Sequence, residues 1–194
     1  MVQIGANDGR EGDPVRGYIE RHRWRGLLIE PQPRIFQELV ANYTDQSQLA
    51  FENALIFDEQ RDDVSLFTVR PDASGGDDRL HVMARLDRGS LVRELREHGV
   101  VDPDAAIEEL KVPAWNPNAL FEKHGLAAFD VLVIDAEGYD FEIVKTIDLE
   151  RYRPALVYFE FTHLTPAEQR QCLTLLAGHG YRMAQLRTDI VAYR

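Results

Sequence analysis

Short apolar runs that alternate with amphipathic segments are the feature that most constrains how this chain can fold. The runs at 26–31 and 129–135 are compact and aliphatic, which is typical of strands buried on both faces of a sheet. The segments at 33–43 and 166–179 carry apolar residues at helical spacing. Strands that alternate with helices predict an α/β fold, in which a mostly parallel sheet has helices on both faces, joined by right-handed crossovers.

The remaining elements follow the same pattern. We predict further strands immediately before Gly5 and at 49–57, 64–69 and 155–161, and a closing antiparallel hairpin from 181–186 and 190–193. Helices are expected at 86–98, 117–124 and 139–147, and a first helix opens at Asp13 and Pro14. The turn-rich segment at about 70–107 is predicted to be an insertion in one domain spanning 1–194, where it forms a lid or a subunit contact, as in a homodimer.

Charge and cysteine content limit the partners and the setting. The chain has 33 acidic and 22 basic residues, and its net charge of −11 repels nucleic acid phosphates and anionic lipids, so we expect neither as a partner. A single cysteine excludes a disulfide framework, and no apolar run approaches the roughly 18 residues of a membrane span, so we expect a cytoplasmic protein. Because the first strand is so short, we also expect the native chain to extend upstream of Met1.

Four predicted strand tips are polar or rich in glycine. They are Gly5 to Gly9, Glu30, Asp135 to Gly138, and Glu160 to His163. In sheets of this kind ligands bind beyond the carboxyl ends of the strands, near the point where the strand order reverses. The coincidence of these tips predicts a site for a nucleotide-like cofactor.

The chemistry of the tips narrows the cofactor class. Glu30 can accept hydrogen bonds from both hydroxyls of a ribose, and Asn53 could either face an adenine ring or cap a turn. The first loop lacks the glycine spacing of a dinucleotide site, and Asp8 would repel a pyrophosphate. A cofactor with a cationic part and no phosphate suits such a pocket better, and S-adenosylmethionine has both properties.

Several segments also carry a family resemblance. The segments at 3–9 (QIGANDG), 28–31 (LIEP), 133–140 (VIDAEGYD), 158–160 (YFE) with His163 and Leu164, and 189–192 (DIVA) resemble the signature segments of the FkbM methyltransferases. This resemblance implies a seven-stranded Rossmann-like fold of the class I methyltransferase type, which binds S-adenosylmethionine and methylates a hydroxyl of a small molecule, sugar or glycan.

The resemblance also implies roles for individual residues. The loop at 5–9 would hold the methionine part, Glu30 the ribose, and Asp135 would lie near the methyl group. The predicted cofactor-binding residues are Gly5, Ala6, Asn7, Asp8, Gly9, Glu30, Pro31, Asn53, Asp135 and Glu137. Gln3 departs from the acid that is common at its position. Its amide can still accept a hydrogen bond from the cofactor's ammonium, but without charge assistance, so we expect a lower affinity.

Methyl transfer is assisted by a base that takes the hydroxyl proton. His163 is the first choice because imidazole titrates near neutrality, although a loop histidine that caps the next helix is the alternative. Asp135 and Glu160 are alternative catalytic residues, better suited to orient the acceptor. Asp135, Glu137, Glu160 and His163 are residue types that suit a divalent ion, but their spacing does not support one, and we predict no metal.

Two other functions compete with methyl transfer. An NAD(P)-dependent oxidoreductase could use a similar sheet, but the glycine spacing and a Tyr-x-x-x-Lys pair at a strand end are missing. A non-catalytic binding module that retains the fold is consistent with Gln3 and with the short first strand.

Overall fold

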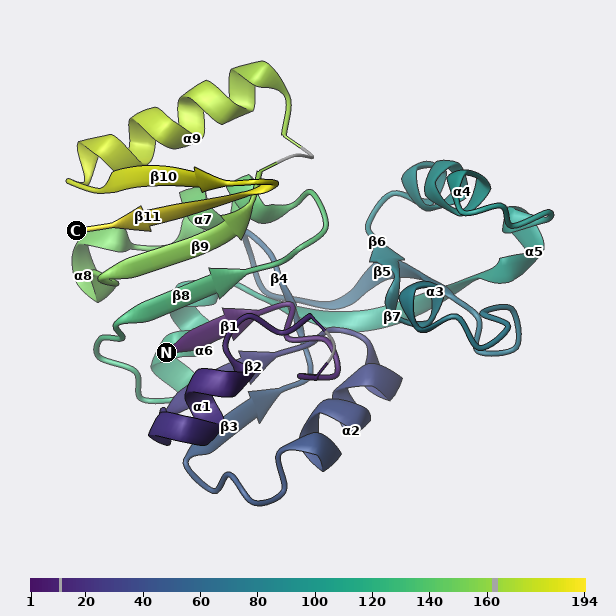
Figure 1. The fold of residues 1–194 in the computed structure, drawn as a ribbon, viewed down its shortest axis with the longest axis horizontal. Coiled ribbons are helices and arrows are strands. Elements are labelled where there is room, and N and C mark those ends of the chain that lie inside the picture. The colour runs from purple at the N-terminus through teal and green to yellow at the C-terminus, as the bar shows by residue number, and fades with distance from the viewer. Residues whose placement is uncertain (11, 162–163) are drawn as a thin grey trace.

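The structure, a computed structural model, describes residues 1–10, 12–161 and 164–194. Within them a seven-stranded sheet has the strand order β10-β11-β9-β8-β1-β2-β3 (Figure 1). Its strands are β1 (Val2–Ile4), β2 (Gly26–Ile29), β3 (Leu49–Glu52), β8 (Val131–Ile134), β9 (Leu156–Glu160), β10 (Arg182–Leu186) and β11 (Asp189–Tyr193). The first five named are parallel, and β11 runs antiparallel to both β9 and β10. The predicted sheet with its closing hairpin is confirmed.

The register of the central strands brings the polar tips to one edge. Ile4 lies opposite Ile29 on one side and opposite Ile134 on the other, and Ile134 lies opposite Phe159. The chain runs outward from β1 to β3 and later returns to β8 on the other side of β1, so the strand order reverses between β1 and β8. This reversal is where ligands bind in sheets of this type.

Helices cover both faces of this sheet, as predicted. On one face α1 (Arg16–His22) and α2 (Pro33–Asn42) pack on inward-facing residues such as Leu28 and Val133. On the other face the helices are α6 (Pro117–Lys123), α7 (Asp140–Thr146), α8 (Leu149–Tyr152) and α9 (Pro166–Gly178). They bury the alternate residues of the same strands, including Ile29, Leu132 and Ile134. The compact apolar runs are therefore explained by burial on both faces.

Two predicted boundaries were wrong. The first helix begins at Arg16 rather than at Asp13, whose Oδ1 accepts hydrogen bonds from the amides of Val15 at 2.7 Å and Arg16 at 3.1 Å. The run at 49–57 is not one strand, because β3 ends at Glu52 and β4 (Leu55–Ile56) belongs to another sheet. The short helix α8 was not predicted.

A four-stranded sheet with the order β4-β7-β5-β6 is the largest departure from the predicted fold. It contains β5 (Arg61–Val69), β6 (Ala84–Arg85) and β7 (Ile107–Trp115), with α3 (Asp78–Val82), α4 (Arg88–Glu97) and α5 (Pro103–Ala106) between them. We call the segment from 55 to 115 the excursion. It contains the insertion predicted at 70–107 but begins earlier and ends later, because β5 and β7 pair with each other and not with the main sheet.

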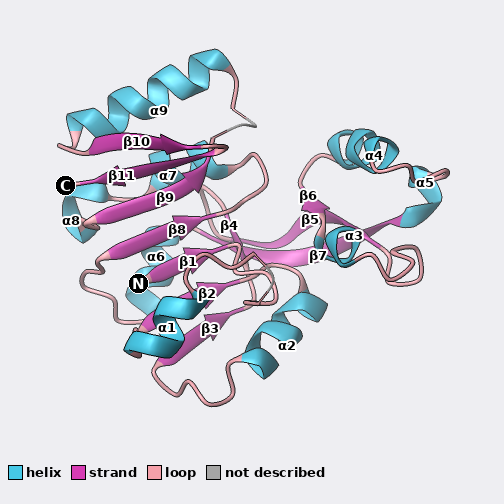
Figure 2. Ribbon diagram, in the orientation of Figure 1, coloured by secondary structure: helices cyan, strands magenta, loops and turns pink. Residues whose placement is uncertain are grey.

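The excursion projects from the main sheet and has a small core of its own (Figures 1 and 2). That core contains Val69, Leu80, Met83, Leu91, Leu95 and Ala106. Among the described residues, no helix is both long and apolar enough to cross a membrane.

Candidate functional site

Gly5 is the point where the first strand ends and the candidate site begins. Its φ is +74°, and its amide and that of Ala6 both donate to the Ile29 carbonyl at 2.9 Å. A Cβ on Gly5 would lie only 1.8 Å from the Asp135 carbonyl oxygen. The loop after β1 therefore passes directly against the end of β8, and only glycine permits this approach.

The amides of the loop at 5–9 are all donated to acceptors within the protein. Asn7 donates to Glu30 Oε2 at 3.0 Å, Asp8 to Asn7 Oδ1 at 2.7 Å, and Gly9 to the Ala6 carbonyl at 3.0 Å. A phosphate cradle needs free N–H groups that point at the ligand. This loop does not offer them, which argues against a phosphate-bearing group here.

Glu30 lies in the interior, at the end of β2, with only 4% of its surface exposed. Its Oε1 accepts from the Gln32 amide at 2.9 Å, and its Oε2 accepts from Asn7. Burial raises the pKa of Glu30 to about 7, the negative charge of Glu137 acts in the same direction, and the two amides oppose both effects. Each carboxyl oxygen keeps a second lone pair for a ligand.

Asn53 supports the turn that carries Glu30. Its Nδ2 donates to the Glu30 carbonyl at 2.8 Å and to the Pro31 carbonyl at 3.2 Å. The neighbouring Ala54 and Leu55 line the adjacent cavity, whereas Asn53 is not among the described residues of its wall. Of the two roles that the sequence left open, the contacts favour capping of a turn.

A cavity lies beside Glu30 and encloses about 710 Å³ of space not filled by protein, open solvent at its mouth included. We call it the first cavity. Its lining from the main domain includes Gly5, Asn7, Glu30, Pro31, Asp135, Glu137 and Tyr139, and its lining from the excursion includes Ile56, Val82, Ala84, Arg85 and Leu86. Its largely apolar wall with a few polar groups is typical of small-molecule sites.

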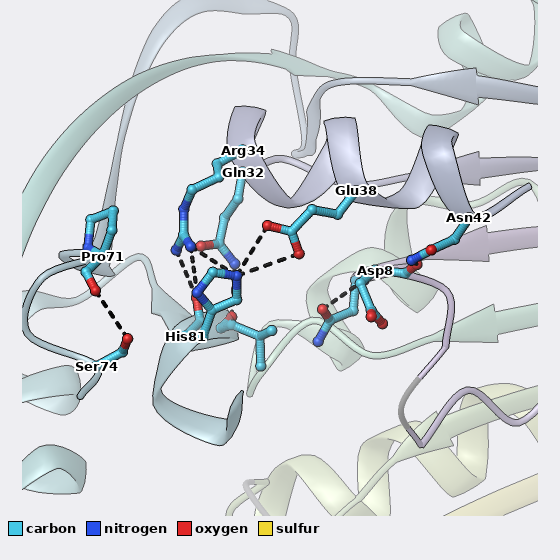
Figure 3. Close-up of polar contacts among 10 residues, drawn as sticks. Asp8, Gln32, Arg34, Glu38, Asn42, Pro71, Ser74 and His81 are labelled. Atoms are coloured by element: carbon cyan, nitrogen blue, oxygen red, sulfur yellow. Dashed lines mark hydrogen bonds and ion pairs between the residues drawn. The ribbon is translucent and has the colours of Figure 1, made fainter. Parts of the chain in front are cut away.

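Contacts with α2 hold the excursion over this cavity. Gln32 Nε2 donates to the Val82 carbonyl at 2.7 Å, and Arg34 Nη2 donates to the His81 carbonyl at 2.9 Å. The His81 ring also contacts Glu38, with 3.1 Å between Nε2 and Oε1. Figure 3 shows these side chains of α2 converging on His81. A second link joins Arg85 Nη1 to Glu137 Oε2 at 2.7 Å.

Carboxylates gather at the ends of β8 and β9. One carboxyl oxygen each from Asp135, Glu137 and Glu160 lies within 4.8 Å of the other two. Asp140, at the start of α7, is almost fully buried and accepts hydrogen bonds from the amides of Ala136 at 3.4 Å and Gly138 at 3.2 Å. Asp189 accepts the Tyr158 hydroxyl at 2.7 Å. The sequence predicted that the tips would meet, and the structure brings these acids together.

The proximity of these acids makes ionisation of Asp135 unfavourable. Solvent reaches part of its side chain, but protein atoms crowd its carboxyl, and this loss of hydration is the first cause that raises its pKa to about 8. The negative charges of Glu137, Asp140, Glu160 and Asp189 add to the shift. Burial likewise raises the pKa of Asp140 to about 7. The site therefore favours a ligand that carries positive charge.

A second cavity lies on the α1 side of these acids. Its lining includes Gln3, Gly5, Ala6, Asn7, Asp13, Asp135, Glu137, Tyr158, Glu160 and Asp189, and contains no lysine or arginine among the residues that the structure describes. Gln3 is 3% exposed, and its Oε1 has no hydrogen-bond partner within the described part of the chain. A buried acceptor without a donor is rare in folded proteins and points to a missing ligand or water.

Comparison with known families agrees with the geometry. The methyltransferase FkbM domain matches residues 3–183. The chain belongs to the FkbM methyltransferase family. The family predicted from the signature segments is thus confirmed, although the sequence matches no curated protein.

One solved structure supports the fold of this FkbM domain. The methyltransferase FkbM from Methylobacillus flagellatus is 14% identical with a TM-score of 0.56, and the match covers 100% of this chain and 43% of that one. The chain therefore spans less than half of that relative. Precorrin-6y C5,15-methyltransferase from Geobacter metallireducens is 13% identical with a TM-score of 0.45, and the match covers 100% of this chain and 79% of that one. A fibrillarin pre-rRNA processing protein from Methanococcus jannaschii is 10% identical with a TM-score of 0.49, and the match covers 98% of this chain and 63% of that one.

Apart from Asn53, the predicted residues of the FkbM domain fall into three groups. Those that line the two cavities are Gly5, Ala6, Asn7, Glu30, Pro31, Asp135, Glu137 and Glu160. Gly9 packs against Tyr43, since a Cβ on Gly9 would lie 2.4 Å from the Tyr43 ring. The carbonyl of Asp8 accepts a hydrogen bond from Nδ2 of Asn42, on α2, at 2.9 Å. His163 lies outside the described residues.

Other residues of the site were not predicted from the sequence. Gln32 directly follows the Glu30–Pro31 tip, so its position was a usable signal. Arg85 and Val82 come from the excursion, which carries no motif, and their place in the wall follows only from the tertiary contacts.

Replacing Gly5 by alanine should destabilise the protein by about 3 kcal/mol or more, because the new Cβ would clash with the Asp135 carbonyl in addition to the strain at positive φ. Gly12 is the matched control, since its φ is +70° but no described atom lies within 4 Å of its Cβ position. Gly12→Ala should cost only about 1–2 kcal/mol. Urea unfolding measures the free energy of unfolding of both variants. An equal loss of stability in the two would show that the structure relieves the clash at position 5.

The pKa of Glu30 predicts a pH dependence of stability. Its folded value of about 7 lies above the ordinary 4.5, so its contribution is complete below pH 4.5 and is lost as the pH rises through about 7. In the protein without ligand, the free energy of unfolding should therefore decrease with pH in this window. Glu30→Gln should flatten the decrease, and Glu150→Gln, at an exposed acid on α8, should not. Urea unfolding at a series of pH values tests this prediction. If the free energy of unfolding changes with pH equally in Glu30→Gln and in wild type, the raised pKa of Glu30 is contradicted.

Proposed function

We propose that this chain binds S-adenosylmethionine and transfers its methyl group to a hydroxyl oxygen of a small molecule, sugar or glycan. The observation that carries the proposal is the combination at the strand tips. The amides of the loop at 5–9 all donate within the protein, so none is free to bind a phosphate. Glu30 has carboxyl oxygens that can accept hydrogen bonds from a ribose, and a cluster of carboxylates lies nearby. A nucleoside cofactor with a cationic end matches all three features, and membership of the FkbM family supports the same cofactor.

The residues present fit this cofactor. Gly5 lets the loop after β1 pass directly against Asp135, and Gly5, Glu30 and Asp135 all line the first cavity. Glu30 would accept the ribose hydroxyls, and the apolar residues Ala54, Leu55 and Ile56 form a wall for the adenine in the first cavity. Asp135, at the meeting point of both cavities, would lie near the methionine part and its positive charges.

The second cavity is our proposed acceptor site. S-adenosylmethionine supplies a methyl group on a sulfonium, whose leaving group is a neutral thioether. The protein has to align the acceptor oxygen and accommodate its proton. Asp135 and Glu160 can accept hydrogen bonds from hydroxyls of the acceptor and so orient it, and His163 remains our predicted base. Carboxyl oxygens that accept hydrogen bonds suit an acceptor rich in hydroxyls.

The site argues against an oxidoreductase but does not distinguish an enzyme from a non-catalytic binding module. An NAD(P)-dependent oxidoreductase is disfavoured because its pyrophosphate would meet a loop without free amides and a cluster of carboxylates. A non-catalytic binding module would contain the same cofactor site, so only turnover distinguishes it from an enzyme.

Calorimetric titration with S-adenosylhomocysteine should show one site per chain. Glu30→Ala should weaken binding by about 10- to 100-fold, the usual range for a hydrogen bond to a charged group. Glu30→Gln should lie between wild type and alanine because it keeps one acceptor oxygen, and Glu150→Ala should bind like wild type.

Absence of binding by the wild type would contradict the proposed cofactor, and unchanged affinity of Glu30→Ala would contradict its ribose role. Turnover is measured with radiolabelled S-adenosylmethionine and a panel of sugars and polyols. Binding without transfer to any of them would favour the non-catalytic module.

A further inference from the structure

The carboxylates of Asp135, Glu137 and Glu160 have the spacing of ligands around one ion. Their nearest oxygens all lie within 4.8 Å of one another, and they come from the ends of adjacent strands β8 and β9. Oxygens that bind Ca²⁺ lie about 2.3–2.6 Å from the ion, so two ligands on opposite sides are about 5 Å apart. The three oxygens can therefore share one hard divalent cation. Sequence spacing could not show this proximity, which is why the sequence predicted no metal.

The fold holds these acids together against their repulsion. Asp135 is fixed by its backbone, since its amide donates to the Ile4 carbonyl at 2.9 Å and Gly5 packs against its carbonyl. Glu137 has a φ of +54° and pairs with Arg85, which also binds Glu94 at 2.8 Å. A set of carboxylates that the fold holds close together suits a hard divalent cation.

Gln3 gives an independent indication of a ligand in the same cavity. Gln3 lines the second cavity together with all three acids, and only 3% of its surface is exposed. Its Oε1 accepts no hydrogen bond within the described part of the chain. Hard cations such as Mg²⁺ keep several waters when they bind to proteins. A water on the cation would supply the donor that this amide oxygen lacks.

We propose that Asp135, Glu137 and Glu160 ligate one hard divalent cation and that a water bound to this cation donates a hydrogen bond to Gln3 Oε1. The cation takes one carboxyl oxygen from each acid and keeps coordination positions open toward the second cavity. Its role there rests on the proposed function: an acceptor with two neighbouring hydroxyls, such as a sugar diol, would place both oxygens on the cation. Binding of the cation itself requires neither cofactor nor acceptor.

The test is a titration of the metal-free full chain with Mn²⁺, followed by calorimetry and by the loss of the free-ion signal in electron paramagnetic resonance. We expect one saturable site from which Mg²⁺ or Ca²⁺ displaces Mn²⁺. Asp135→Asn and Glu160→Gln should each weaken binding by more than about tenfold, because each removes a ligand. Asp63→Asn, which removes one exposed acid on β5, should bind like wild type.

Gln3 has its own pair of variants. Gln3→Leu should weaken Mn²⁺ binding by about tenfold, the lower end of the range for residues that support a metal through a hydrogen bond. Gln3→Glu keeps an acceptor and adds charge, so it should bind at least as tightly as wild type. If Gln3→Leu binds Mn²⁺ normally but S-adenosylhomocysteine more weakly, the amide serves the cofactor's ammonium and the proposed role of Gln3 is overturned.

Circular dichroism melting shows that the variants are folded. Loss of one acid relieves repulsion, so Asp135→Asn and Glu160→Gln should melt no lower than wild type without metal. Mn²⁺ should raise the melting temperature of wild type and Asp63→Asn but not of these two. Absence of a saturable Mn²⁺ site, or equal binding by the ligand variants, would overturn the proposal.

The two proposals of this article fail separately. S-adenosylhomocysteine binding by protein without a Mn²⁺ site would overturn only the cation site. A Mn²⁺ site in protein that does not bind S-adenosylhomocysteine would overturn only the proposed cofactor.

Discussion

The contact between the end of β1 and the end of β8 is the constraint on which the site depends. Gly5 leaves its strand with a left-handed backbone and lies against the Asp135 carbonyl, while the amide of Asp135 donates to Ile4. This contact closes the point at which the strand order reverses. It fixes the loop at 5–9 and the acidic tip of β8 relative to each other, so the two cavities share a common wall. A side chain at position 5 would push the loop at 5–9 away from the tip of β8.

The second constraint is the concentration of negative charge around that contact, which the protein accommodates in a different way at each position. Backbone amides solvate Glu30 and Asp140, the Tyr158 hydroxyl donates to Asp189, and Arg85 pairs with Glu137. Burial and mutual repulsion nevertheless raise the pKa of Asp135 well above its usual range. The carboxyl oxygens of Asp135, Glu137 and Glu160 lie within 4.8 Å of one another, so a cation that enters between them is attracted by all three, and this proximity is the physical basis of both proposals.

The excursion adds the part of the site that the main sheet cannot supply. It reaches the first cavity with Val82, Ala84, Arg85 and Leu86, and it is anchored to α2 by contacts of Gln32, Arg34 and Glu38 with the segment at 81–82. Stacking of Phe57 on Tyr139, with 5.4 Å between the ring centroids, joins its beginning to the tip of β8. The excursion thus lines the first cavity, the proposed cofactor site, whereas the described wall of the second cavity, the proposed acceptor site, comes from the main domain.

The sequence by itself determined the α/β class, the closing hairpin and the position of the polar strand tips among the described residues. These features depend on local periodicity and on residues adjacent in the chain, as at 26–31 and 129–135. Tertiary structure alone decided the pairing of β5 with β7, the hydrogen bond from Asn53 to the Glu30 carbonyl, the place of Arg85 beside Glu137, and the proximity of Asp135 to Glu160. Each of these joins segments that are distant in sequence and whose local pattern is compatible with more than one neighbour. Proximity in space is a property of the packed sheet, and a one-dimensional pattern does not contain it.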